Sequence, residues 1–151
     1  MWKIIFILIA LLVIYKIPLY GKIPKEMIEK AEELDKMSSN KLELVKSIYN
    51  FVNVSYQSPI RQYLREPEKI FIKDISAIWN LKGSYMPSNA QNDMAKQLLL
   101  LTGKFNESNF RIEQKWCEIS PHQIMFVNVD GKEFISIDPE SNTSLTSWGN
   151  A

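Results

Sequence analysis

The sequence predicts an α+β fold: an N-terminal membrane helix, then one domain in which helices pack on a small antiparallel sheet. Three observations carry this prediction. A long apolar run stands near the amino terminus, and further on apolar residues recur at helical spacing, most regularly over 42–52. Two runs of strand-forming residues, 122–129 and 133–137, flank the turn residues Asp130 and Gly131. Helices followed by antiparallel strands are typical of α+β domains.

The N-terminal segment, residues 1–22, is predicted to be a transmembrane signal anchor. Its apolar run from Ile4 to Tyr15 has 12 residues, which as a helix span about 18 Å, short of the ~30 Å hydrocarbon core. Extending the segment over residues 2–20 makes it long enough to cross. No small-residue cleavage site follows, which favours an uncleaved anchor over a cleaved signal peptide or a buried core helix. We expect a single-pass membrane protein whose domain lies on the extracytoplasmic side.

The helical elements follow the anchor. Charged residues dominate the first predicted helix, which lies in a linker at 23–40. Asn40 can cap the next helix, and Asp74 can cap a short one further on. Between these two helices, residues 56–73 form an extended connection, and connections of this length often cover a site. The predicted helices of this part are 24–36, 42–52 and 75–81.

Composition argues against several functional classes. The chain has 18 basic and 17 acidic residues, a formal net charge of +1, which gives no reason to expect a nucleic acid partner. The single cysteine, Cys117, permits neither an internal disulfide nor a cysteine metal site. No phosphate-binding glycine loop is present. We therefore expect no cofactor and no metal.

The hairpin around Asp130–Gly131 sets the position of the only histidine, His122. A two-residue loop would place His122 opposite Pro139. A three-residue loop of Val129, Asp130 and Gly131, with glycine in the left-handed position, would pair Asn128 with Lys132. His122 would then lie opposite Asp138, with Cβ atoms about 5 Å apart. In this register His122 and Asp138 share one face of the hairpin. The opposite face is apolar and is lined by Met125, Val127, Ile135 and Ile137.

Residues 85–103, "YMPSNAQNDMAKQLLLLTG", predict a buried helix that begins near Ser88. Serine is a common N-cap, and Asn89 can cap as well. Asp93 is expected in the first turn, where a negative charge favours the helix dipole. A nucleophile at the same place gains from the positive end of that dipole. Ser88 is therefore either a helix cap, a nucleophile, or the remnant of a nucleophile's position.

Three features occur in order: a buried helix opening at Ser88, the strand "PHQIMFVNV", and the strand end "FISIDP". This pattern resembles the transglutaminase-like superfamily, a branch of the papain-like fold. There a cysteine opens the core helix, a histidine opens a later strand, and an aspartate followed by proline closes the next. In the family a glycine follows the cysteine by about 15 residues, and Gly103 lies 15 residues after Ser88. The resemblance covers a domain at 41–140 and leaves 141–151 as a polar tail.

The resemblance implies a catalytic triad at Ser88, His122 and Asp138, but without the family's cysteine. The histidine would deprotonate the nucleophile, and the aspartate would orient the histidine. No cysteine lies between Gly83 and Gly103. Serine depends fully on its base, because its hydroxyl does not ionise near neutral pH. The alternatives near Ser88 are Ser84 and Tyr85; Cys117 is a further candidate, with burial in the core as the simpler reading.

The expected function is that of a catalytically inactive, membrane-anchored domain that binds or scaffolds a peptide or protein partner. The predicted cleft lies between Ser88, His122 and the 56–73 connection. The alternative is a serine-dependent amidase or peptidase with a Ser88–His122–Asp138 triad. A third possibility is a structural protein whose N-terminal helix joins a larger membrane complex.

Overall fold

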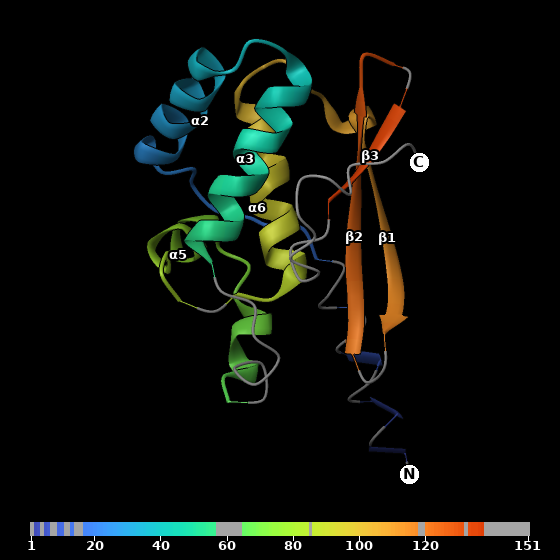
Figure 1. Ribbon diagram of the computed structural model, residues 1–151. Helices are drawn as coiled ribbons and strands as arrows, with labels where there is room; N and C mark the ends of the chain where they lie inside the picture. The colour runs from blue at the N-terminus through green and yellow to red at the C-terminus, as the bar shows by residue number, and fades with distance from the viewer. Residues whose placement is uncertain are drawn as a thin grey trace.

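The computed structural model describes residues 2–3, 5–6, 9–10, 13, 17–56, 65–84, 86–117, 120–131 and 133–137. In chain order the elements are α2 (Lys25–Met37), α3 (Lys41–Ser55), the 3-10 turn η1 (Pro67–Phe71), α5 (Ile75–Asn80), α6 (Ser88–Leu101), the 3-10 turn η2 (Glu107–Asn109), β1 (Phe110–Cys117), β2 (Ser120–Val129) and β3 (Glu133–Ile137). Figure 1 shows α2, α3 and α6 on one side of a three-stranded sheet. The predicted α+β class is confirmed.

Two helices begin at the side chains that the sequence indicated. The side chain of Asn40 accepts a hydrogen bond from the backbone N–H of Glu43, at 2.9 Å, at the start of α3. Asp74 accepts from the backbone N–H of Ala77, at 2.8 Å, at the start of α5. Each bond satisfies a backbone donor that the first helical turn leaves without a partner.

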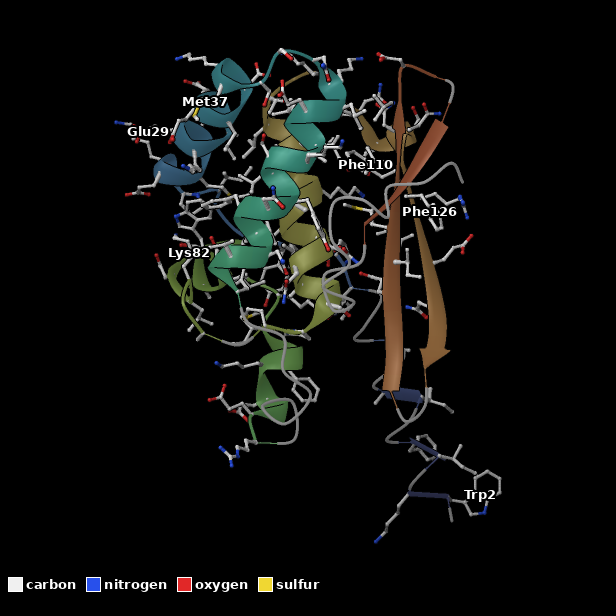
Figure 2. All side chains as sticks on the ribbon, viewed as in Figure 1. Trp2, Glu29, Met37, Lys82, Phe110 and Phe126 are labelled. Carbon is white, nitrogen blue, oxygen red and sulfur yellow. The ribbon has the colours of Figure 1, made fainter. Side chains whose placement is uncertain are left out.

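The helix predicted within a linker, α2, packs into the hydrophobic core. Met27 and Ala31 are fully buried and Leu34 nearly so. Their spacing places them on one face of the helix, and that face joins a core shared with α3, α5, α6 and the sheet. Figure 2 shows Glu29 and Met37 on the outer side of α2. The described domain therefore includes this helix as a packed element.

The sheet has the order β1-β2-β3, and both neighbouring pairs are antiparallel. In the central strand β2, Met125 and Val127 are fully buried against the helices. Phe126 projects from the opposite face (Figure 2), where the guanidinium of Arg111 lies 4.1 Å from the ring centre. One covered face and one more exposed face agree with the predicted apolar side of the hairpin.

The hairpin register differs from the predicted one. Asn128 pairs with Phe134 and not with Lys132, and Val129 pairs with Glu133. The strand β2 therefore extends one residue further before the turn. Asp130 and Gly131 both have positive φ, 58° and 71°, the conformation typical of the central pair of a type I′ turn. The partner of every β2 residue moves by two positions, so the face that each residue occupies is unchanged.

The segment before α2 is held against the start of α5. The backbone N–H of Tyr20 donates to the carbonyl of Lys73, at 3.0 Å, and the N–H of Ile75 donates to the carbonyl of Tyr20, at 2.8 Å. Gly21 follows with φ of 102°, and a Cβ there would lie 2.3 Å from a carboxylate oxygen of Asp74. This close approach requires glycine, and it fixes the position of residues 17–20 beside the domain.

The described residues of the N-terminal segment leave apolar side chains exposed. Trp2 is 77%, Phe6 70% and Val13 58% exposed. Figure 2 shows Trp2 beyond the end of the sheet, away from the helices. Among the described residues, no helix combines the length and the apolar character needed to cross a membrane.

Candidate functional site

The helix α6 begins at Ser88, but Ser88 is not its cap. Pro87 occupies the N-cap position in an extended conformation, and no side chain caps the helix. The backbone N–H of Gln91 donates to the carbonyl of Pro87, at 3.1 Å. Asp93 lies in the second turn, not in the first as expected, and the first turn carries no acidic residue. Ser88 itself is 1% exposed, so its hydroxyl is enclosed by the protein.

The other predicted site residues are distributed as follows. The backbone of His122 lies in β2, paired with Lys115 of β1. Asp138, the predicted partner of His122, lies outside the described residues, as does Tyr85. The register that would have brought His122 opposite Asp138 is not the one formed, because Ile137 pairs with Met125.

Two alternatives to Ser88 have clear structural settings. The hydroxyl of Ser84 donates to the carbonyl of Leu81, at 2.9 Å, and accepts from the ammonium of Lys69, at 3.3 Å. It closes the turn after α5. Cys117 is the last residue of β1, and its backbone pairs with Ser120.

A hydrogen bond joins α6 to the strand that carries His122. The side-chain Nδ2 of Asn92 donates to the backbone carbonyl of Gln123, at 2.9 Å. Asn92 and Ser88 are one helical turn apart and so lie on the same face of α6. The first turns of α6 therefore lie beside the start of β2, next to His122 in the chain.

A cluster of buried polar side chains surrounds this contact, and the sequence did not single it out as a site. Asn89 and Asn92 are fully buried, Lys73 is 3% and Gln123 4% exposed. Within the described part of the chain, several of their polar atoms have no hydrogen-bond partner: both side-chain atoms of Asn89, Oδ1 of Asn92, Oε1 of Gln123 and Nζ of Lys73. Each such atom costs about 1–3 kcal/mol of stability. Buried polar atoms of this kind need a specific explanation.

One sequence signal points to this cluster. The first six residues of α6, "SNAQND", include five polar residues, although the helix ends in "QLLLL". A helix that is polar along one half and strongly apolar along the other half is poorly explained by core packing alone. Lys73 and Gln123 come from distant parts of the chain, and no local pattern predicts that they are buried here.

Burial also changes the protonation of charged groups in the cluster. It raises the pKa of Asp93 from 3.8 to about 6, although the ammonium groups of Lys73 and Lys96 lower it in part. Burial lowers the pKa of Lys73, and the nearby carboxylate of Asp93 opposes this effect. Lys96 forms an ion pair with Glu107, at 2.5 Å. The environment therefore disfavours both the Asp93 carboxylate and the Lys73 ammonium.

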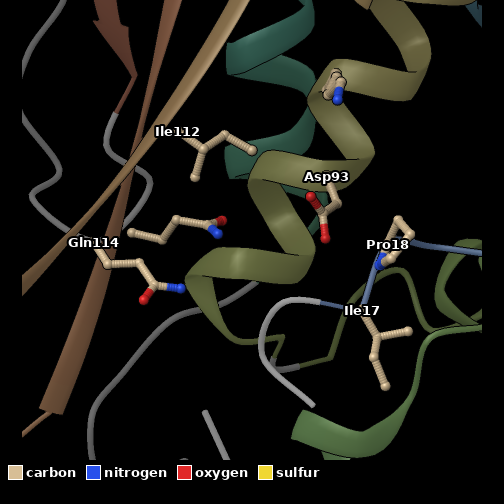
Figure 3. Close-up of a pocket in the computed structure, with 7 residues that line it drawn as sticks. Ile17, Pro18, Asp93, Ile112 and Gln114 are labelled. Carbon is tan, nitrogen blue, oxygen red and sulfur yellow. The ribbon is translucent and has the colours of Figure 1, made fainter. Parts of the chain in front are cut away.

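A cavity of about 490 Å³ opens beside the cluster. We call it the α6–β1 cavity. Figure 3 shows that its lining side chains come from α6, from the sheet, and from the segment that precedes α2. The described residues that line it are Ile17, Pro18, Asp93, Lys96, Ile112, Gln114 and Gln123. Its volume lies within the roughly 300–1,000 Å³ range of small-molecule sites.

Within the described residues, no group of three histidine, cysteine, aspartate or glutamate side chains is placed to hold a metal ion. The lining of the cavity suits hydrogen bonding to a ligand that carries apolar groups. Compared with protein-family models, with curated proteins and with solved structures, the chain has no match in any of the three.

Proposed function

We propose that this chain is a membrane-anchored, transglutaminase-like domain that has lost the nucleophilic cysteine and binds a peptide or protein partner without cleaving it. The observation that carries the proposal is the contact between α6 and β2. A buried helix that begins at Ser88 is tied through Asn92 to the strand of His122. The sequence resemblance expects a catalytic cysteine at the helix start, and the only cysteine is Cys117, in β1.

The setting of Ser88 supports a role other than catalysis. A nucleophile must meet a substrate carbonyl, and Ser88 is 1% exposed. A serine hydroxyl also lacks the acidity that lets a cysteine profit from the positive end of a helix. Both considerations favour a domain that keeps the family's fold but no longer catalyses its reaction.

The buried polar cluster supports binding. Asn89, Asn92 and Gln123 hold amide atoms inside the protein without hydrogen-bond partners among the described residues. Such an arrangement lowers stability, and proteins keep costly polar groups mainly where function requires them. A partner that supplies hydrogen bonds would offset this cost.

The test of lost catalysis is labelling with a serine-reactive fluorophosphonate. We expect the folded chain to remain unlabelled in intact-mass spectrometry, because the hydroxyl of Ser88 is enclosed by the protein. An active serine hydrolase in the same tube shows that the probe works. Labelling that the Ser88→Ala variant abolishes would contradict the proposal and favour a serine-dependent amidase or peptidase.

The membrane part of the proposal rests on the apolar run from Ile4 to Tyr15 and on the exposed apolar side chains of Trp2, Phe6 and Val13. Large exposed apolar groups mark surfaces that other molecules or membranes cover. We propose that the run is a signal anchor and that the domain after it is exported to the extracytoplasmic side.

We expect the full chain to stay with membranes after alkaline extraction and the Ile9→Lys variant to be released. A lysine at the centre of a spanning helix costs about 3 kcal/mol. Val54→Lys is the matched control, because Val54 is 83% exposed on α3, outside the anchor, and this variant should stay with membranes. Release of the unmodified chain would contradict the anchor.

A further inference from the structure

The chain at the end of the proposed anchor is fixed to the domain. Tyr20 forms two backbone hydrogen bonds, of 3.0 Å with the carbonyl of Lys73 and of 2.8 Å with the N–H of Ile75. On either side of Tyr20, the side chains of Leu19 and Ile23 pack against the hydrophobic core. A flexible linker lets a domain move away from its anchor, but this segment is packed on the domain. An anchor that ends at Tyr20 therefore brings the surface around Tyr20 to the membrane.

The turn η1 lies next to this fixed point. Its last residue, Phe71, precedes Lys73 by two residues, a separation that the backbone limits to about 7 Å. Lys73 in turn is hydrogen-bonded to Tyr20. In Figure 1 η1, drawn in green, projects from the helices toward the end of the molecule where the N-terminus lies. Figure 2 shows Met37 at the opposite end. The turn η1 is therefore on the side of the domain that faces the proposed anchor.

The side chains exposed on this side suit a membrane interface. Tyr20 is 60%, Phe71 51% and Ile17 40% exposed. Tyrosine is enriched where membranes meet water, and phenylalanine is typical of the apolar face of helices that lie in the interface. Covering these groups with lipid removes apolar surface from water. Lys69 of η1 forms an ion pair with Glu66, at 2.5 Å, so its charge is compensated close to the surface.

We propose that η1 is a second membrane contact, in which Phe71 inserts into the interfacial layer of the bilayer beside Tyr20 and holds the domain against the lipid surface. The inference rests on the proposed anchor and deepens it, because it assigns the domain an orientation and a lipid-facing surface. The interfacial layer is about 5–8 Å thick on each side of the hydrocarbon core, a depth that a single phenylalanine side chain reaches.

The test uses the full chain in phosphatidylcholine nanodiscs, one copy per disc, with Cys117→Ser and one introduced cysteine that carries a fluorescent dye. Glu68→Cys places the dye on η1. Glu29→Cys is the matched control, an exposed glutamate of α2 at the opposite end of the domain. We expect a lipid with a spin-labelled headgroup to quench most of the fluorescence at position 68 and little at position 29. Equally weak quenching at both positions would overturn the inference.

Replacing Phe71 tests whether its side chain makes the contact. Phe71→Asp should remove most of the quenching at position 68, because a charged carboxylate is costly to move out of water. Met37→Asp is the matched control: Met37 is 74% exposed at the opposite end of the domain, and its replacement should leave the quenching unchanged. Full quenching in the Phe71→Asp chain would contradict the assigned contact. If that variant fails to fold, positions 68 and 29 in the chain with native Phe71 decide.

A third dye position separates failure of this contact from failure of the anchor. Val13→Cys places the dye within the apolar run, where a lipid that is spin-labelled on its acyl chain should quench it. If position 13 is quenched and position 68 is not, the η1 contact is wrong and the anchor stands. If position 13 is not quenched, the anchor is wrong, and the η1 contact is wrong with it.

Discussion

Replacing Asp93 with asparagine is expected to raise the free energy of unfolding at pH 7 by about 2–3 kcal/mol. The carboxyl pKa rises from 3.8 to about 6 on folding, mainly because the group is buried, and a change of this size corresponds to about 3 kcal/mol. This cost already includes the attraction of Lys73 and Lys96. Asparagine keeps the shape of the side chain and removes the charge.

The difference in unfolding free energy between the Asp93→Asn variant and the native chain should increase as the pH rises. Below pH 3.8 Asp93 is protonated in both the folded and the unfolded chain, so the variant and the native chain should be equally stable. Between pH 3.8 and about 6 the unfolded chain loses the proton first, and the native chain loses stability as the pH rises. Above pH 6 the full difference should be present.

Urea unfolding of both proteins at several pH values measures this difference. Glu29→Gln is the matched control: it also removes one negative charge, from an exposed pair with Lys25, and should change stability by less than about 0.5 kcal/mol. Lower stability of Asp93→Asn at pH 7 would contradict the account. It would show that the attraction between Asp93 and Lys73 outweighs the cost of burial.

Much of the fold follows from local patterns. The caps at Asn40 and Asp74, the helix start at Ser88 and the turn at Asp130–Gly131 all lie where the sequence indicates. These features depend on side chains that act within a few residues of their own position. The hairpin register was wrong because the loop between the paired residues is 130–132 and not 129–131. Both loops have three residues, and local residues do not decide which one forms.

The candidate site was less predictable, because its chemistry depends on contacts between distant segments. A serine before an amphipathic run indicates a cap, but Pro87 takes that place and Ser88 becomes the first helical residue. Asp93 was predicted to lie in the first turn of the helix and to interact with its dipole. Its pKa is instead set by burial and by Lys73, which lies 20 residues earlier in the chain. Gln123 was not singled out in the sequence, yet its side chain lies in the buried cluster.

The second large effect concerns the Ser88→Cys substitution, made together with Cys117→Ser. Since Cys117 is the only native cysteine, the double variant carries a single thiol, at the helix start. If Ser88 stands where a catalytic cysteine once stood, the helix should favour the thiolate there. We expect a thiol pKa below about 7.5, against about 8.5 for a free cysteine, and about eightfold more thiolate at pH 7.

The central claim is that Ser88 marks the position of a lost nucleophile, and the pH profile of thiol reactivity tests it most directly. The rate of reaction with a small methanethiosulfonate is measured from pH 5 to 10. Burial of the site lowers the rate at every pH, and it also raises the pKa of the thiol, which the midpoint of the profile reports. A lowered midpoint therefore requires the helix start to outweigh burial. A midpoint below about 7.5 in the folded chain that returns to about 8.5 in urea is the predicted result. A midpoint at or above 8.5 in the folded chain would contradict the claim.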